Sequence, residues 1–104
     1  MKTIMLVCCA GMSTSLLVTK MNLAAAKAGI EIRIFAAGEI EVKSHLEEIN
    51  LLLLGPQVRY LLSKMEKMTA LKGIPVGVIN GMDYGTLNGE AVLNQALKLM
   101  ESAS

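Results

Sequence analysis

The fold is decided by one stretch near the N-terminus, residues 3–18, which reads TIMLVCCAGMSTSLLV. Its first part, residues 3–7, is a nearly continuous apolar run, as expected of a strand buried on both faces. Small residues at 11–15 predict a turn, and their hydroxyls can cap a helix over about residues 15–28. Gly29 is suited to end that helix, because glycine readily adopts the left-handed conformation found after a helix C-terminus. The stretch therefore predicts a strand, a short loop and a helix in succession.

The same alternation continues along the chain. Further strands are expected at residues 30–35, 50–54 and 75–79, and helices at about 39–49, 57–72 and 89–101, with a turn-rich loop at 80–88. The helix at 57–72 is predicted from an apolar stripe at helical spacing: Val58, Leu61, Leu62, Met65, Met68 and Leu71. Gly73 should end it. The pattern predicts an α/β fold, a single four-stranded parallel sheet with helices on both faces, in one domain spanning residues 1–104.

Length and composition exclude several classes of protein. The chain has 104 residues, 53% of them hydrophobic, and a formal net charge of +1. Near-neutral charge gives nucleic-acid binding little electrostatic basis, and the apolar content argues against disorder. The longest apolar run is far shorter than the roughly 20 residues of a membrane helix, so no membrane insertion is expected. Adjacent Cys8 and Cys9, the only cysteines, are ill placed to bridge each other and indicate a reducing cytoplasm.

Ligands of parallel α/β sheets bind beyond the carboxyl ends of the strands, where the loops here should begin at Cys8, Ala36, Gly55 and Asn80. The Cys8 loop lies between a buried strand and a helix N-terminus, which offers unpaired backbone N–H groups and a positive dipole end to an anion. The same field favours the nucleophilic thiolate of a cysteine. The loop therefore suits a cysteine that accepts and holds a phosphoryl group.

Other interpretations of this loop stay open. Cys8 and Cys9 could simply be small buried residues at the end of a strand, with the hydroxyls capping the helix. A metal site is disfavoured, because Cys8, Cys9 and His45 lack the ligand spacing of zinc sites, and no cofactor is expected. His45 is expected to face solvent. Tyr60 and Tyr84 could belong either to the core or to the rim of the site, and Met12 at the loop tip could contact a partner.

One absence separates two enzymatic functions. Tyrosine phosphatases carry an arginine six residues after the cysteine, where it grips phosphate and stabilises the transition state. Here that position is Thr14. Without the arginine, phosphoryl transfer loses an important source of charge stabilisation. A loop that binds phosphate yet hydrolyses it poorly is what a phosphoryl carrier needs.

At this loop the sequence resembles the enzyme IIB components of the bacterial phosphotransferase system for sugar uptake, in the lactose/cellobiose/diacetylchitobiose family. The resemblance rests on the segments LVC-x-AGMSTSLLV at 6–18 and LLLGPQV at 52–58 followed by Tyr60, with a weaker match at Tyr84 and Gly85. It implies a fold similar to low-molecular-weight tyrosine phosphatases. It also implies a transferase in which Cys8 accepts phosphate from a phosphohistidine of enzyme IIA. Cys8 would then pass the phosphate to a sugar, such as a β-linked disaccharide, held by the membrane component enzyme IIC.

The resemblance also implies roles for individual residues. The phosphate would be cradled by the backbone amides of Cys9, Ala10, Gly11, Met12, Ser13, Thr14 and Ser15. Neighbouring loops would bring Gly55, Pro56, Gln57 and Tyr84 to the rim of the site. Cys9 departs from the family, which usually carries a residue such as serine there, and residues 80–83 depart from an Asp-Ser pair. The alternatives are a small cysteine-dependent phosphatase and an anion-binding or redox-sensing module that uses the adjacent thiols.

Overall fold

The computed structural model describes residues 1–8 and 12–103. The strands are β1 (Lys2–Val7), β2 (Ile32–Ala37), β3 (Leu51–Leu54) and β4 (Val76–Val78). The α-helices are α1 (Met12–Lys27), α2 (Val42–His45), α3 (Leu62–Thr69), α4 (Gly81–Gly85) and α5 (Gly89–Ala103). Short 3-10 helices, η1 (Glu39–Glu41), η2 (Pro56–Leu61) and η3 (Ala70–Lys72), adjoin α2 and α3. Within this described part of the chain, none of the helices has the length and apolar character needed to span a bilayer.

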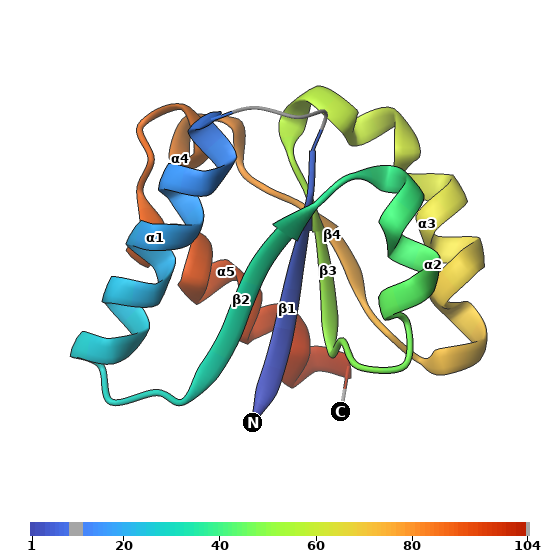
Figure 1. The fold of residues 1–104 in the computed structure, drawn as a ribbon, viewed down its shortest axis with the longest axis horizontal. Helices are drawn as coiled ribbons and strands as arrows, with labels where there is room; N and C mark the ends of the chain where they lie inside the picture. The colour runs from blue at the N-terminus through green and yellow to red at the C-terminus, as the bar shows by residue number, and fades with distance from the viewer. Residues whose placement is uncertain (9–11, 104) are drawn as a thin grey trace.

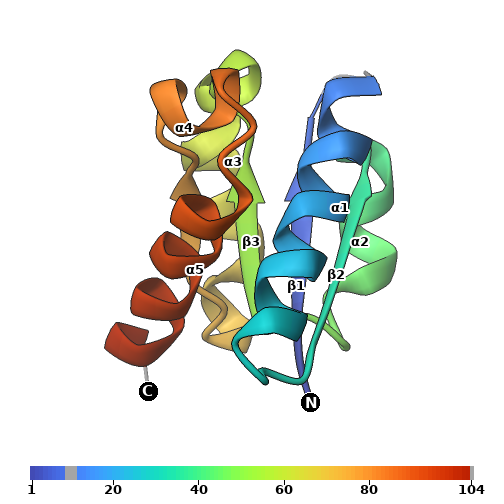
Figure 2. The same ribbon diagram turned by 90° about the vertical axis from the view of Figure 1, so that its left-hand side faces the viewer.

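The strands form one parallel sheet in the order β2-β1-β3-β4, with α1 and α5 on one face and α2 and α3 on the other (Figures 1 and 2). The predicted fold class is therefore confirmed. The apolar runs of β1 and β3 occupy the two central positions, where every residue of β3 is buried. Because all strands run the same way, their carboxyl ends meet at one edge of the sheet.

Alternate residues of the central strands face two separate cores. Ile4, Leu6, Leu51 and Leu53 pack against α1 and α5. The core beneath α1 and α5 also contains Leu17, Met21, Val92, Leu93 and Ala96. On the opposite face, Met5, Val7, Leu52 and Leu54 pack with Val42, Ile49, Val58, Leu61 and Met65. This division follows from strand geometry, since successive side chains point to opposite faces of a sheet.

Two glycines end helical segments as the sequence predicts. Gly29 follows α1 with a φ of +70°, and Gly73 follows η3 with a φ of +67°. Both are the left-handed conformations predicted for these glycines. Helix α1, however, begins at Met12, three residues earlier than predicted, so most of the expected turn at 11–15 is helical. Serine and threonine are well tolerated there, because the N–H groups of a first helical turn have no intrahelical partner.

The segment at 57–72 is not the single helix that its stripe predicts. It divides into η2, α3 and η3, and Val58 has a non-helical backbone (φ −115°, ψ 26°). A 3-10 helix has three residues per turn, so η3 rotates the following side chains out of the stripe. Leu71 is accordingly 98% exposed, and its assignment to the core stripe was wrong. The other members of the stripe are buried or partly buried.

Two predicted loops also differ. Strand β2 continues through Ala37, which pairs with Val7, so the loop after it begins at Gly38 rather than at Ala36. The stretch at 80–88 contains the short helix α4 in place of turns alone. Asn80 caps it, because its side-chain oxygen accepts hydrogen bonds from the N–H groups of Met82 and Asp83. An asparagine side chain at this position replaces the missing intrahelical partners.

Candidate functional site

Cys8 directly follows β1 at the carboxyl edge of the sheet and is almost completely buried. Strand β1 lies between β2 and β3, so the loops after both neighbours flank the cysteine. The loop after β3 approaches closely: Gly55 donates a hydrogen bond from its N–H to the carbonyl oxygen of Val7. The loops that follow β1 and β3 therefore lie side by side at Cys8 and Gly55.

The sulfur of Cys8 has a hydroxyl partner on α1. The Oγ1 of Thr14 lies 2.8 Å from the Cys8 Sγ and donates a hydrogen bond to it. The same oxygen lies 3.0 Å from the Oη of Tyr84, which comes from α4 at the far end of the sequence. Thr14 and Tyr84 are both buried. Tyr84, which the sequence left between core and rim, is thus a core residue whose hydroxyl reaches the site.

The first turn of α1 contains four of the residues predicted to bind phosphate: Met12, Ser13, Thr14 and Ser15. Backbone N–H groups in a first helical turn lack intrahelical partners and carry the positive end of the helix dipole. Since Thr14 bonds to Cys8, this turn lies beside the sulfur. The other predicted phosphate-binding residues, Cys9, Ala10 and Gly11, lie outside the described residues.

Two clefts open beside Cys8, on the side of β2. One, of about 280 Å³, is lined by Cys8, Thr14 and Ser15 together with the end of β2 and Glu41. The other, of about 310 Å³, lies between the loops after β2 and β3, where Ile40 and Tyr60 contribute to its wall. Gly38 and Glu41 line both clefts, although no motif in the sequence marks them as site residues. Their position depends on β2 pairing with β1, and strand order was not predicted.

The rim residues from the loop after β3 have unequal positions. Gly55 is buried against the cysteine, Pro56 is half-buried and Gln57 is exposed. A Cβ atom at position 55 would lie 3.6 Å from the Cβ of Cys8 and 2.8 Å from the Oε1 of Gln57. The side chain of Gln57 therefore folds back over Gly55, toward the site. Tyr60 from the same loop is largely exposed.

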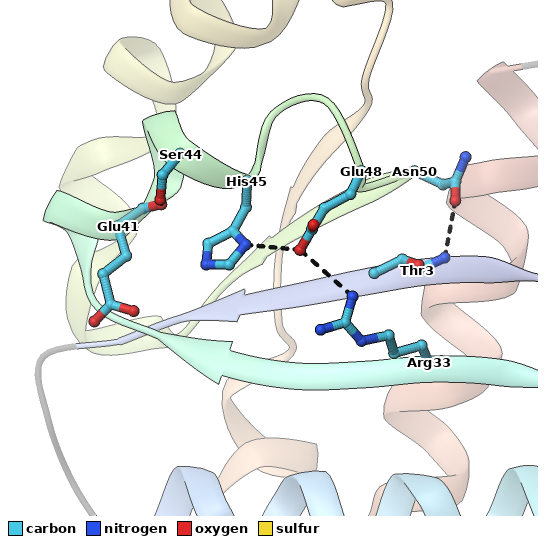
Figure 3. Close-up of polar contacts among 7 residues, drawn as sticks. All are labelled: Thr3, Arg33, Glu41, Ser44, His45, Glu48 and Asn50. Carbon is cyan, nitrogen blue, oxygen red and sulfur yellow. Dashed lines mark hydrogen bonds and ion pairs between the residues drawn. The ribbon is translucent and has the colours of Figure 1, made fainter.

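His45 belongs to a separate polar cluster (Figure 3). Its Nδ1 lies 2.7 Å from the Oε1 of Glu48, and its ring packs against Phe35 at 4.9 Å between centroids. Arg33 lies 3.4 Å from the same carboxylate oxygen. The hydrogen bond with His45 is the main reason that the pKa of Glu48 is lowered from its ordinary value. His45 is half-buried, not fully solvent-facing as predicted, and it lines neither cleft beside Cys8.

Among residues 1–8 and 12–103, no group of three histidine, cysteine, aspartate or glutamate side chains is placed to hold a metal ion. The described site offers the sulfur of Cys8, the hydroxyl groups of Thr14 and Tyr84, the amides of a helix N-terminus, and a cleft that Ser15 and Glu41 also line. This arrangement can bind an anion next to a nucleophilic sulfur.

Nearly the whole chain is similar to known proteins of one family. Residues 3–95 match the family model described as the lactose/cellobiose-specific IIB subunit of the PTS system, the phosphotransferase system. The chain is 43% identical over 100 residues to the oligo-beta-mannoside-specific EIIB component of Bacillus subtilis, covering 96% of this chain and 97% of the relative. It is 42% identical over 104 residues to the galactose-specific EIIB component of Lactococcus lactis subsp. cremoris, covering 95% and 96%.

Solved structures give the same result. The cellobiose-specific IIB component of Borrelia burgdorferi is 40% identical and superposes with a TM-score of 0.82, over 99% of this chain and 94% of that one. The lactose-specific IIB domain of Streptococcus pneumoniae shares the fold, with a TM-score of 0.85 at 19% identity over 94% and 96%. The chain thus belongs to the lactose/cellobiose-specific IIB family of the phosphotransferase system, whose members are sugar-specific components that take part in phosphoryl transfer during sugar uptake.

Proposed function

We propose that this protein is a phosphoryl carrier in which Cys8 is phosphorylated by the phosphohistidine of an enzyme IIA. Cys8 then passes the phosphoryl group to a sugar bound by a membrane enzyme IIC. The observation that carries the proposal is the position of the Cys8 sulfur. It lies at the carboxyl edge of the sheet, beside the N-terminal turn of α1, with a hydroxyl donor 2.8 Å away. The protein would act in the cytoplasm as one IIB domain over residues 1–104.

The two steps balance in bonds and charge. In the first, the sulfur of Cys8 forms a bond to phosphorus while the N–P bond of the phosphohistidine breaks and the imidazole leaves with the electron pair. In the second, the sugar hydroxyl oxygen forms a bond to phosphorus while the S–P bond breaks. The electron pair returns to the sulfur, and the hydroxyl proton passes to a base on the acceptor side. Both steps need the phosphoryl group to be positioned and its charge to be stabilised.

Backbone groups supply that stabilisation in the proposed mechanism. The amides of residues 9–15 would hold the phosphoryl oxygens at the positive end of α1. No arginine lines either described cleft beside Cys8, and Thr14 occupies the position at which a phosphatase would carry its arginine. This composition supports a carrier over a phosphatase, because a phosphatase must also drive rapid attack by water.

The partners would dock on apolar side chains around the cysteine. Large hydrophobic residues are exposed in the loops after three strands and early in α1: Leu16, Ile40, Tyr60 and Met82. We name these four residues the apolar rim. Ile40 and Tyr60 line a cleft together with Cys8, and exposed apolar groups beside a reactive centre are typical of a protein interface. A net charge of +1 provides little long-range steering, so contact at this rim would dominate recognition.

The sugar is proposed from the relatives alone. Those quoted above are named for oligo-beta-mannoside, galactose, cellobiose and lactose. We propose a β-linked disaccharide such as cellobiose, lactose or chitobiose. The choice can be tested by supplying these sugars to membranes containing the cognate enzyme IIC and measuring which one becomes phosphorylated.

The carrier function is tested by reconstitution. The protein is incubated with phosphoenolpyruvate, the general phosphotransferase proteins and a cognate enzyme IIA, and mass spectrometry locates the phosphate. We expect iodine-sensitive phosphate on Cys8, lost in Cys8→Ser and retained in Cys9→Ser. Phosphate that survives in Cys8→Ser but disappears in Cys9→Ser would contradict the assignment of the nucleophile. Rapid multiple-turnover hydrolysis of an aryl phosphate by the isolated protein would instead identify a phosphatase.

A further inference from the structure

Two hydrogen bonds link Tyr84 to Thr14 and Thr14 to Cys8, and their directions are fixed when the Cys8 sulfur is the acceptor. A threonine hydroxyl has a single proton, and Thr14 donates it to the Cys8 Sγ. The Oγ1 of Thr14 can then only accept in its 3.0 Å contact with Tyr84, so the phenol of Tyr84 must be the donor. We infer that Tyr84, Thr14 and Cys8 form a directed relay, in which the Tyr84 hydroxyl polarises the Thr14 hydroxyl and Thr14 stabilises negative charge on the sulfur.

The relay is built from three elements that the fold holds in place. Cys8 ends β1, Thr14 lies in the first turn of α1, and Tyr84 lies in α4. Thr14 is 2% exposed and Tyr84 is 8% exposed, so both members of the hydroxyl pair are buried residues. A hydrogen bond in such an environment is electrostatically stronger than one in water.

Helix α4 is itself braced by β4 and α5. The N–H of Tyr84 bonds to the carbonyl oxygen of Asn80 at 2.9 Å. Gln95 of α5 accepts from the N–H of Asn80 at 3.3 Å and donates to the carbonyl oxygen of Val78 at 2.8 Å. Asn80 also caps α4 through its side chain. The phenol is therefore positioned by a chain of backbone and side-chain bonds, and not by packing alone.

The relay acts on the charge of the sulfur, which changes during the proposed transfer. The sulfur is negative as a thiolate, loses that charge when it bonds to phosphorus, and regains it when the S–P bond breaks. A donor aimed at an atom where charge develops stabilises the transition state. Thr14 touches the reacting sulfur and is a catalytic residue in this scheme, whereas Tyr84 acts through Thr14 and is a positioning residue. The inference rests on the proposed phosphorylation of Cys8.

The two steps should depend on the relay unequally. Stabilising a thiolate raises its population but lowers its intrinsic nucleophilicity, so the two effects partly cancel when the sulfur attacks. When the sulfur leaves, stabilisation of the same charge accelerates the step without an opposing effect. The relay therefore favours discharge of the phosphoryl group to the acceptor more than loading from the donor. This role is distinct from the predicted binding of phosphate by the backbone amide of Thr14.

The first test uses the isolated protein and needs no partner. The thiolate form of Cys8 is followed by ultraviolet absorbance over a pH series, in a Cys9→Ser background, for Thr14→Val, Thr14→Ser, Tyr84→Phe and the control Thr19→Val. Thr19 is exposed and bonds to the carbonyl oxygen of Ser15. We expect Thr14→Val to show about tenfold less thiolate absorbance than the parent at neutral pH, since it loses a hydrogen bond to the charged sulfur. Tyr84→Phe should lower the thiolate absorbance severalfold. Thr14→Ser and Thr19→Val should match the parent.

Folded Thr14→Val and Tyr84→Phe proteins with the parent's thiolate profile would overturn the relay. Tyr84→Phe keeps the test decisive if Thr14→Val does not fold, because it removes a single oxygen atom. A merely structural role of Tyr84 would lower the melting temperature and leave the thiolate profile unchanged.

The second test separates loading from discharge. We expect Thr14→Val to slow discharge to the acceptor by about tenfold to a hundredfold, the range for a hydrogen bond to a charged group, and to slow loading much less. Equal slowing of both steps would assign Thr14 to phosphate binding and overturn the relay. A parent protein that takes no phosphate on Cys8 would contradict the proposed function, while the thiolate measurement would still decide whether the relay exists.

Discussion

Gly89, the first residue of α5, lies directly against the backbone of Lys20 in α1. A Cβ atom at position 89 would stand 2.5 Å from the carbonyl carbon of Lys20 and 2.7 Å from its carbonyl oxygen. Atoms at these distances overlap, and the obstacle is helix backbone that cannot turn aside as a flexible side chain can. The close approach lets the two helices that cover one face of the sheet pack together.

Substitution of Gly89 should therefore destabilise the fold. We expect Gly89→Ala to lower the free energy of unfolding by about 1–3 kcal/mol, the usual cost of overpacking. Gly55→Ala is the matched control, because its added methyl group would displace only the flexible end of Gln57 and its φ of −63° suits alanine. Urea denaturation measures both variants. An equal loss of stability in the two would contradict the role assigned to the helix contact.

The central strand β3 and the 3-10 helix η3 offer a second matched pair. Leu53 is completely buried in the core beneath α1 and α5, whereas Leu71 is 98% exposed. We expect Leu53→Ala to cost about 2–5 kcal/mol through lost burial and the cavity left behind. Leu71→Ala should change stability by no more than about 0.5 kcal/mol. A large loss in Leu71→Ala would show that Leu71 belongs to the core stripe after all.

The polar cluster around Glu48 predicts a pH dependence. The pKa of Glu48 is lowered in the folded state, chiefly by its hydrogen bond with His45 and further by Arg33. The stabilisation is therefore fully present above the ordinary glutamate value of 4.5 and is lost as the pH falls through the lowered pKa. We expect the melting temperature of the parent to exceed that of Glu48→Gln above this value, with the difference shrinking in acid. The difference should be small, because the carboxylate is exposed.

The exposed Glu66→Gln is the control for Glu48→Gln, since the side chain of Glu66 has no hydrogen bond or ion pair in the described part of the chain. A melting-temperature difference between the parent and Glu48→Gln that grows in acid would contradict the predicted sign.

The apolar rim predicts a loss of partner recognition without a loss of stability. Ile40 is 94% exposed and lines the larger cleft beside Cys8. We expect Ile40→Asp to slow enzyme IIA-dependent phosphorylation of Cys8 by about tenfold, since a charge at an apolar contact must be desolvated. Leu71→Asp is the control, because Leu71 lies in η3, which precedes β4 and so leads to the amino end of that strand, opposite the carboxyl edge. Equal phosphorylation rates in the two variants, with unchanged melting temperatures, would exclude Ile40 from the docking surface.

The sequence was sufficient to predict the fold class because its signals are local. Two buried apolar runs, at β1 and β3, occupy the centre of the sheet, and Gly29 and Gly73 end their helices as predicted. Leu71 was wrongly assigned to the buried stripe, because a change from α-helical to 3-10 geometry alters the direction of its side chain and leaves no mark in the apolar spacing of the sequence.

The site could be predicted only in part. Cys8 and the hydroxyl residues after it are neighbours in the chain, so their association could be recognised without a structure. Thr14 and Tyr84 are 70 residues apart, and Glu41 reaches the site only because β2 pairs with β1. Strand order and tertiary contacts of this kind leave no periodic pattern in a single sequence.

The sheet separates the two cores, so the contacts of the Cys8 sulfur and the wall of the larger cleft depend on different faces of the sheet. The relay from Tyr84 to Cys8 rests on α1, α4 and α5, over one core, while the wall of the larger cleft comes from η1 and η2, beside the other. Substitutions on opposite faces share few neighbours, so their effects on stability should be nearly additive. Within the family, the cleft side could thus change by substitution while the contacts of the Cys8 sulfur stay as they are.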